Sequence, residues 1–297
     1  MKKIFIVIVV FLVSLKAVDI IFVKFIGLGS PLIYRHSKIY GYDLKPNQKI
    51  LRRGKSVTIN DFGMRSLKNW SDQYEKKLLF FGDSVTFGGS LVNDEDTFVE
   101  QICKKIKNIK TICGNYSVNG YGIEAISKRI KYKNFFDEDL IIITVIGNDF
   151  LRGFANLGVQ PFTTKKYPVI FPALIELFFL STDNIRNKIK YNFNNISENK
   201  QTLERYQNDQ LNYFLETLEE LNKEYFVFYS PEYSEFKGNN EYENIKTILS
   251  ENIKNFFDLT SEIKKHEEKI YYDGVHLNKL GHKLYSDIIF KKIKDSL

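Results

Sequence analysis

Residue types that together perform nucleophilic catalysis occur far apart in this chain. Ser84 follows a glycine and four consecutive apolar residues at 78–81, and His276 follows Asp273 by three positions. Hydrolysis through a serine requires a base that takes the hydroxyl proton and a carboxylate that orients the base. Each of these components is present. Taken alone, Gly-Asp-Ser is equally compatible with a loop whose Asp and Ser only cap the next helix.

Two further segments offer hydrogen-bond donors for the oxyanion that forms during acyl transfer. Gly120 lies in the flexible run Asn-Tyr-Ser-Val-Asn-Gly-Tyr-Gly, where its lack of a side chain permits close approach of the backbone to a ligand. Asn148 lies in Ile-Gly-Asn-Asp and supplies a carboxamide. Developing negative charge is stabilised by such donors. Each segment follows an apolar run, so the chemistry is expected where predicted strands end.

From residue 78 onward, apolar runs alternate with amphipathic segments, which is typical of βαβ units on a parallel sheet. The predicted strands are Lys77–Phe81, Ile109–Cys113, Leu140–Ile146, Tyr225–Tyr229 and Asn255–Leu259. Helices are expected near 95–107, 122–133, 201–223, 240–253 and 279–294. Ligands of open α/β sheets bind at the carboxyl ends of the strands. We therefore expect the candidate residues to meet at that edge.

In order along the chain, the segments Gly82-Asp83-Ser84, Gly120, Gly147-Asn148-Asp149 and Asp273-Gly274-Val275-His276 resemble the motifs of the SGNH serine hydrolases, also called GDSL esterases. The resemblance runs from about residue 78 to the end. It implies a three-layer α/β/α sandwich with a central, mainly parallel five-stranded sheet of flavodoxin-like type. It also implies Ser84 as nucleophile, His276 as base and Asp273 as its orienter. Ser84 N–H, Gly120 N–H and the Asn148 side chain would form the oxyanion hole.

Other polar residues near these segments are given structural roles. Asp83 and Asp149 are expected to cap and brace loops, and His282 to lie on the C-terminal helix as a structural residue. Arg152 is expected to face solvent, although its place soon after the third predicted strand is also compatible with contact to an anionic substrate. The remaining histidines, His36 and His266, lie outside any motif. We expect neither a metal nor a cofactor.

The N-terminus departs most from the average composition. Lys2 and Lys3 precede a long apolar run that continues to Ile26, interrupted by Lys16, Asp19 and Lys24. A signal anchor and a cleaved signal peptide both fit this pattern. The anchor is favoured because Leu15 occupies the position where a cleavage site needs a small residue. Lys16 and Asp19 are three positions apart and can pair on one helix face. The basic start then predicts a cytoplasmic N-terminus and an extracytoplasmic catalytic domain.

Net charge and cysteine content bear on the partners and the cellular location of the chain. A net charge of +7 is compatible with nucleic acid, but the lysines are scattered, so we expect a solvated basic surface and no nucleic-acid binding. Cys103 and Cys113 can form one disulfide outside the cytoplasm or remain two buried thiols.

Three parts of the chain are expected. Residues 1–27 form the anchor, and 28–76 form a connecting region that packs on the catalytic domain, with a short strand and turn at 58–65. Residues 77–297 form the hydrolase domain, with an insertion at 151–200 over the active-site face.

The function expected from these observations is that of a membrane-anchored serine ester hydrolase outside the cytoplasm. Its expected substrates are small acyl esters, such as O-acetyl groups, on surface or secreted polysaccharide. The same residues are compatible with an O-acyltransferase acting on glycan, because a sugar hydroxyl can replace water in resolving the acyl-enzyme. A lipid esterase, with an apolar lid at 169–180, and a catalytically idle glycan-binding protein are further alternatives.

Overall fold

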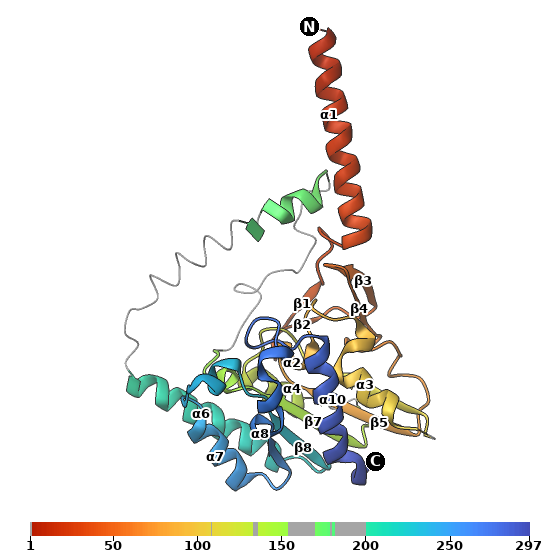
Figure 1. Cartoon of the computed structure of the whole chain (residues 1–297). Coiled ribbons are helices and arrows are strands. Elements are labelled where there is room, and N and C mark those ends of the chain that lie inside the picture. The colour runs from red at the N-terminus through yellow and green to blue at the C-terminus, as the bar shows by residue number, and fades with distance from the viewer. Residues whose placement is uncertain (1, 108, 133–135, 154–169, 179, 182–199) are drawn as a thin grey trace.

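A five-stranded parallel sheet forms the centre of the computed structural model, which describes residues 2–107, 109–132, 136–153, 170–178, 180–181 and 200–297 (Figure 1). The strands are β5 (Lys76–Phe81), β6 (Thr111–Asn115), β7 (Leu140–Val145), β8 (Tyr225–Tyr229) and β9 (Phe256–Asp258). Their spatial order is β6-β5-β7-β8-β9, and every neighbouring pair is parallel. The predicted sheet is confirmed.

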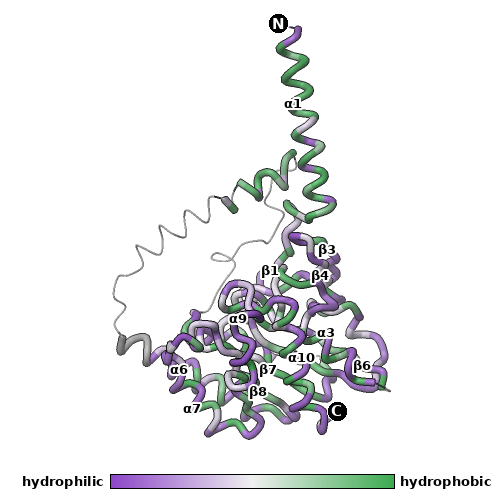
Figure 2. The backbone as a smooth tube through the Cα atoms, viewed as in Figure 1, coloured by the Kyte–Doolittle hydropathy of each residue, from purple (hydrophilic) through white to green (hydrophobic). Residues whose placement is uncertain are grey.

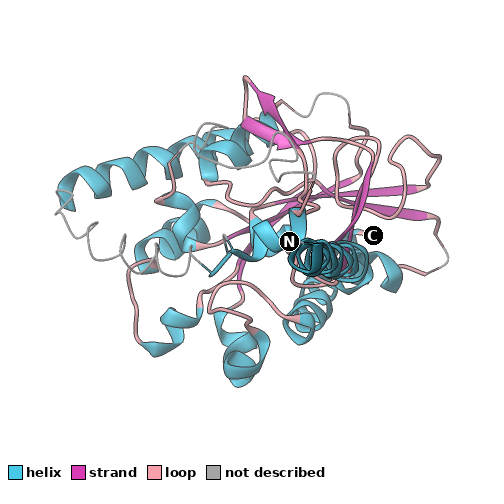
Figure 3. Ribbon diagram, turned by 90° about the horizontal axis from the view of Figure 1, so that it is seen from above, coloured by secondary structure: helices cyan, strands magenta, loops and turns pink. Residues whose placement is uncertain are grey.

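Helices cover both faces of the sheet, as the view from above shows (Figure 3). One face packs against α3 (Phe98–Lys105), α8 (Thr260–Ile263), α9 (Glu267–Ile270) and α10 (Lys279–Ile293). The other packs against α4 (Ile123–Lys131), α6 (Lys200–Glu219) and α7 (Glu243–Asn252). Successive residues of a strand point to opposite faces, so Leu78 and Phe80 join the first core, and Leu79 and Phe81 the second. The predicted three-layer sandwich is confirmed.

Some predicted boundaries shift by a few residues. The second predicted strand begins at Thr111, because Thr111 is the residue that pairs with Lys76 of β5, while Ile109 is 38% exposed before the strand. The helix expected near 95–107 is divided into a 3₁₀ turn at Asp94–Asp96 and α3. Thr97 separates them, and its hydroxyl accepts a hydrogen bond from Glu100 N–H as the N-cap of α3.

Residues 28–76 contain more regular structure than the sequence indicated. Two antiparallel hairpins pair β1 (Tyr34–Ser37) with β2 (Gly41–Leu44), and β3 (Gln48–Arg52) with β4 (Lys55–Ile59). Of these four strands, only β4 overlaps in sequence with the short strand and turn predicted at 58–65. The other three strands are short and mostly polar, so their sequences carry little alternation of apolar residues.

The two hairpins share a hydrophobic core with one face of the main sheet. Tyr42, Leu44 and Val57 pack with strand residues such as Phe81. Polar contacts reinforce this packing, since Asp43 pairs with the buried Arg129 of α4 at 2.7 Å.

The N-terminal helix projects from the end of the domain at which the hairpins lie (Figure 1). α1 (Lys2–Ile21) continues into a π-helical turn, η1 (Phe22–Ile26), giving one helix of 25 residues that is long and apolar enough to cross a membrane. Figure 2 shows the near-continuous apolar character of α1. Lys16 Nζ lies 3.4 Å from Asp19 Oδ2, which confirms the predicted pairing.

The insertion expected at 151–200 is described only in part. Residues 154–169 and 182–199 lie outside the described residues. Residues 172–178 form a helix that contacts the C-terminal end of α1, called its foot below. Cys103 and Cys113 are buried free thiols rather than a disulfide. Burial raises the pKa of the Cys113 thiol, and the adjacent Cys103 raises it further.

Candidate active site

The turn after β5 presents Ser84 at the carboxyl end of the sheet. Gly82 has φ +155°, and a Cβ atom there would lie 2.3 Å from Thr86 Oγ1 and 2.7 Å from Thr144 O. A side chain at position 82 would clash with these atoms, so only glycine fits here. Asp83 then acts as the N-cap of the short helix α2 (Ser84–Phe87), accepting a 2.8 Å hydrogen bond from Val85 N–H. Ser84 is the first residue of α2 and remains half-buried.

A loop before α10 holds the other two residues of the predicted triad. Asp273 Oδ1 accepts hydrogen bonds from Val275 N–H at 3.2 Å and His276 N–H at 2.9 Å, so the loop wraps around its own carboxylate. Asn278 closes the loop as the N-cap of α10, accepting from the N–H groups of the next turn. Both candidate side chains therefore lie on one compact turn, as their spacing indicated.

Ser84, His276 and Asp273 form a hydrogen-bonded chain. His276 Nε2 lies 2.8 Å from Ser84 Oγ, and His276 Nδ1 lies 2.8 Å from Asp273 Oδ2. Burial opposes ionisation of Asp273, but hydrogen bonds from the backbone and ring of His276 outweigh it and hold the pKa of Asp273 below its ordinary value. The carboxylate is thus ionised at neutral pH and can orient the imidazole, which can take a proton from Ser84.

Gly120, on the loop after β6, lines the same cavity as Ser84. Its φ of +79° is in the left-handed region, which favours glycine. Tyr42 of the β1–β2 hairpin donates a 2.6 Å hydrogen bond to Asn119 O, and Asn119 Nδ2 donates to the Tyr34 hydroxyl at 3.2 Å. The hairpin thereby fixes the loop that carries Gly120.

Asn148 occupies the loop after β7, within η3 (Gly147–Phe150), and is exposed. Its backbone carbonyl accepts from Leu151 N–H at 3.2 Å and Arg152 N–H at 3.0 Å. Asn148 is not among the residues that line the cavity around Ser84. The structure therefore brings Ser84, Gly120, Asp273 and His276 together, and the role of Asn148 stays a prediction.

An open cavity of about 750 Å³ contains the triad. Its walls come from the segment before β1, the β3–β4 turn, the loop after α2, the Gly120 loop and the triad loop. The lining residues are Pro31, Leu32, Tyr34, Arg52, Arg53, Lys55, Ser84, Gly89, Ser90, Leu91, Asn119, Gly120, Arg152, Tyr272, Asp273 and His276. Much of this wall precedes residue 77, where we predicted no site residue because that part of the sequence contains no catalytic motif. No group of three or more His, Cys, Asp or Glu suited to a metal was found among the described residues.

Arg152 is a cavity residue that we expected to face solvent, and that expectation is wrong. Its side chain is 27% exposed, donates a 2.7 Å hydrogen bond to Tyr121 O, and lies 3.5 Å from both Asp83 and Asp149. Burial and the neighbouring Asp83 raise the pKa of Asp149 well above its ordinary value. The charges of Asp149 and Asp83 in turn outweigh burial and raise the pKa of Arg152. Asp83 and Asp149 brace loops here, as predicted.

His282 is structural. It is fully buried on α10, its ring stacks on Phe98 at 5.7 Å, and its Nδ1 accepts from Phe98 N–H at the start of α3. His282 therefore joins two packed helices rather than entering the cavity.

A serine, histidine and aspartate linked in this way at the edge of a parallel α/β sheet define a serine hydrolase. The chain belongs to the GDSL-like lipase/acylhydrolase family, whose model matches residues 78–289. It is accordingly a hydrolase of ester bonds.

Solved structures with a similar fold are distant in sequence. A member of the lipolytic G-D-S-L family from Veillonella parvula is 15% identical, with 74% of this chain and 97% of that chain covered and a TM-score of 0.42. A lipase/acylhydrolase from Enterococcus faecalis is 16% identical, with 74% and 96% covered and a TM-score of 0.45. A two-domain esterase active on acetylated mannans is 11% identical, with 74% and 49% covered and a TM-score of 0.44. No curated protein matches the chain.

Proposed function

We propose that this esterase removes small acyl groups, such as O-acetyl, from surface or secreted polysaccharide through an acyl-enzyme on Ser84. The enzyme would be anchored in the membrane by α1, with its catalytic domain outside the cytoplasm. The observation that carries the catalytic assignment is the pair of 2.8 Å contacts that link Ser84 Oγ to His276 and His276 to Asp273.

In the first half of the reaction, Ser84 Oγ attacks the ester carbonyl carbon as its proton passes to His276 Nε2. The carbonyl oxygen becomes an oxyanion, which we assign to the N–H groups of Ser84 and Gly120 and the carboxamide of Asn148. Collapse of the tetrahedral intermediate breaks the bond to the sugar oxygen, and that oxygen takes the proton from His276.

The second half releases the acyl group. A water molecule loses a proton to His276 Nε2 and attacks the acyl carbon, and Ser84 leaves as its Oγ regains that proton. The products are the deacylated sugar and a carboxylic acid. Asp273 stabilises the imidazolium that forms in both halves.

An exposed tyrosine and the open mouth of the cavity support a hydroxylated, amphipathic substrate. Tyr272 is 68% exposed at the lip of the cavity, next to Asp273. A tyrosine ring offers an apolar face together with a polar hydroxyl, which suits a sugar surface. The cavity is open, so a substituent on a long polymer can enter while the chain remains outside.

A lipid esterase is the second candidate, and the position of the β3–β4 turn favours it. Gly54 N–H in this turn donates a 2.6 Å hydrogen bond to Ile26 O at the end of the N-terminal helix, and the turn residues Arg53 and Lys55 line the cavity. The cavity thus adjoins the foot of the proposed anchor, where lipid headgroups would lie.

The proposed function is tested with the full-length protein in detergent, supplied with acetylated glycans, acetylated monosaccharides, long-chain acyl esters and phospholipids. Products are identified by mass spectrometry for wild type, Ser84→Ala and the control Ser250→Ala on an exposed position of α7. We expect acetate from acetylated glycan with wild type and the control, and a loss of at least about 10³-fold with Ser84→Ala.

Three results would contradict the proposal. Turnover by Ser84→Ala equal to wild type would remove Ser84 from the nucleophile role. Fatty acid as the main product would favour the lipid esterase. Transfer of the acetyl group to a second sugar in place of acetate release would identify an O-acyltransferase.

A further inference from the structure

A short helix of the insertion is fastened to the foot of α1. Asp19 Oδ1 accepts hydrogen bonds from Ala173 N–H at 2.9 Å and Leu174 N–H at 3.1 Å, at the N-terminus of the helix 172–178. Lys16 Nζ donates to Ile170 O at 2.5 Å and lies 5.6 Å above the Phe171 ring. The polar residues that interrupt the apolar run of α1 therefore serve as the attachment site of this helix.

A second set of contacts ties the same helix to the catalytic domain. Glu176 is buried, and its two carboxylate oxygens receive hydrogen bonds or ion pairs at 2.6 Å from the two terminal nitrogens of Arg52. Gly29 N–H donates to Glu176 at 2.5 Å. A fork-like contact of this kind fixes orientation as well as distance. The foot of α1, the β3–β4 hairpin and the helix 172–178 consequently form one unit.

The length of the N-terminal helix places this unit at the level of the membrane. The whole helix, residues 2–26, is about 37 Å long, whereas residues 2–15 alone extend about 21 Å, at about 1.5 Å per residue. The hydrocarbon core of a bilayer is about 30 Å thick. If α1 spans the core, the residues between Lys16 and Ile26 must lie in its outer part or at its surface, and the attached helix lies beside them.

The side chains on this unit suit that location. Ile170 is 68% exposed, Phe178 64% and Leu177 38%, and on the neighbouring helix Ile21 is 52% and Phe25 66% exposed. Figure 2 shows the apolar short helix beside the apolar α1. Two N–H groups at the start of the helix are satisfied by Asp19, and the charge of Glu176 is paired with Arg52. Satisfied backbone groups are what an element in lipid requires.

We propose that residues 170–178 form a second membrane contact, with Ile170, Leu177 and Phe178 embedded in the outer leaflet beside α1. This inference rests on the proposed membrane insertion of α1. One helix alone leaves an attached domain free to rotate, whereas two contacts fix its orientation. The β3–β4 turn, and with it the Ser84 cavity, is then held against the headgroup layer.

The test uses the full-length protein in nanodiscs of phosphatidylethanolamine and phosphatidylglycerol. A spin label is attached to Phe178→Cys, to Ile8→Cys within α1 and to Ser250→Cys on α7, with the wild-type protein as the blank, since Cys103 and Cys113 are buried. Depth is read from the relative accessibility of each label to oxygen, which concentrates in lipid, and to a water-soluble nickel complex. We expect lipid-like values at positions 8 and 178 and water-like values at position 250.

The outcomes separate this inference from the proposal on which it rests. A lipid-like label at 8 with a water-like label at 178 overturns the second contact and leaves the anchor intact. A water-like label at 8 overturns both. Ester hydrolysis measured on the same samples reports independently on the catalytic assignment.

The attachment itself is tested by Asp19→Ala combined with Phe178→Cys. Loss of the two hydrogen bonds to Ala173 and Leu174 should mobilise the label and shift its accessibility towards water. Ser14→Ala, on an exposed position of α1, should leave both readings unchanged. An unchanged depth and mobility in Asp19→Ala would overturn the role of Asp19 in holding this helix on the anchor.

Discussion

At the scale of single residues, the candidate site combines a partly exposed Asp–His pair with more deeply buried polar side chains that brace the neighbouring loops. Asp273 and His276 keep 46% and 31% of their side-chain areas exposed, so local hydrogen bonds, not burial, orient them. Asp83, Asp149 and Arg152 form a more deeply buried group of ionisable side chains behind the turns. The loops that carry Ser84 and Asn148 are thus braced by buried side chains, whereas the orientation of His276 depends on hydrogen bonds within its own turn.

Asn148→Ala should lower kcat by roughly 10²-fold or more and leave KM nearly unchanged. A donor to the oxyanion acts mainly when negative charge develops, so its loss falls on the transition state. Steady-state kinetics on one acyl ester measures this, with Asn252→Ala on an exposed position of α7 as the control. An increase in KM alone would make Asn148 a substrate-binding residue, and unchanged kinetics would remove it from the site.

The buried His282 should make stability depend on pH. Burial and the nearby Arg65 lower the pKa of His282 to about 3, below the value near 6.5 of an unfolded chain. The unfolded state therefore binds a proton first as the pH falls. The contribution of His282 is full above about pH 6.5 and is lost progressively as pH falls toward 3, with a slope of about 1.4 kcal/mol per pH unit.

His282→Asn should remove this part of the pH dependence, because an Asn oxygen can accept from Phe98 N–H but does not titrate. Urea unfolding in detergent at several pH values between 7 and 4 gives the slope for each protein. His266→Asn, at an exposed histidine, should retain the wild-type slope. Identical slopes for wild type and His282→Asn would contradict the assigned protonation behaviour.

At the scale of elements, the parts that the sequence predicted are those with strong local signals. Strands β5 and β7 contain continuous apolar runs, and α10 follows an N-cap. Their predicted bounds therefore differ from those in the structure by at most one residue. The candidate triad could be predicted because Gly82-Asp83-Ser84 and the spacing of Asp273 and His276 are local motifs, and the structure places the three side chains in contact.

The elements that were missed depend on tertiary contacts. The β1–β2 hairpin is stabilised by residues such as Tyr42 and Asp43, whose partners Asn119 and Arg129 lie about 80 positions later. Arg152 was placed in solvent because its partner Asp83 lies on another loop. Neither pairing leaves a periodic pattern in the sequence.

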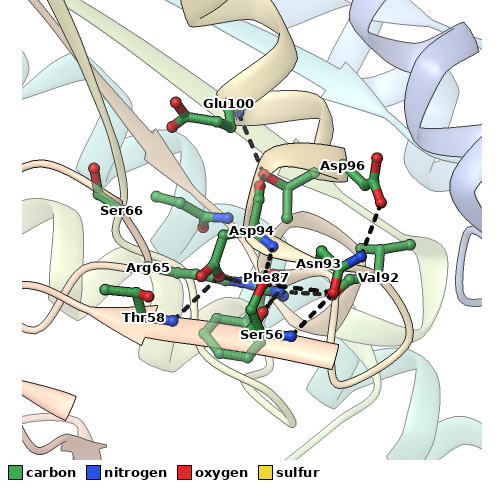
Figure 4. A network of polar contacts seen from close by, with 12 residues as sticks. Ser56, Thr58, Arg65, Ser66, Phe87, Val92, Asn93, Asp94, Asp96 and Glu100 are labelled. Atoms are coloured by element: carbon green, nitrogen blue, oxygen red, sulfur yellow. Dashed lines mark hydrogen bonds and ion pairs between the residues drawn. The ribbon is translucent and has the colours of Figure 1, made fainter. Parts of the chain in front are cut away.

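Arg65, which precedes the sheet, is the centre of a network of polar contacts with β4 and the segment that follows α2 (Figure 4). Its buried guanidinium pairs with Asp94 at 2.9 Å and donates to the carbonyls of Phe87, Gly89, Val92 and Ser56. The loop that follows α2 is thereby tied to β4. Gly89 also lines the cavity, so this contact links a residue outside the family match to the wall of the site.

Arg65→Met should lower the free energy of unfolding by about 3–5 kcal/mol, because it leaves the Asp94 charge and several carbonyls without their partner. Arg35→Met is the matched control: Arg35 pairs with Asp43 at 2.9 Å but is 54% exposed, and the buried Asp43 keeps its ion pair with Arg129, so we expect a loss of about 0–1 kcal/mol. Urea unfolding measures the free energy of unfolding of both variants and of the wild type. A loss for Arg65→Met no larger than that for Arg35→Met would show that the loop is held by other contacts.

At the scale of the whole molecule, the N-terminal helix and the cavity lie at the same end of the domain. The β3–β4 turn meets the end of the N-terminal helix and also lines the cavity. If the N-terminal helix spans a membrane as proposed, substrate can reach the site from the membrane surface or from polymer passing close to it. The membrane topology of the chain therefore decides which substrates reach Ser84.

The chain should insert once, with Lys2 and Lys3 inside and the catalytic domain outside, because basic residues flanking a membrane helix are retained in the cytoplasm. The 25-residue helix is long enough to cross, and the pairing of Lys16 with Asp19 reduces the cost of placing these two charges in the outer part of the membrane. The test is expression in bacteria with a C-terminal tag, membrane fractionation, and protease treatment of spheroplasts, with a cytoplasmic protein as the control for intact cells. A membrane-bound product of full mass that is digested from outside fits this topology. A soluble, shortened product would mean a cleaved signal peptide and loss of the second membrane contact, and protection from the protease would place Ser84 on the cytoplasmic side.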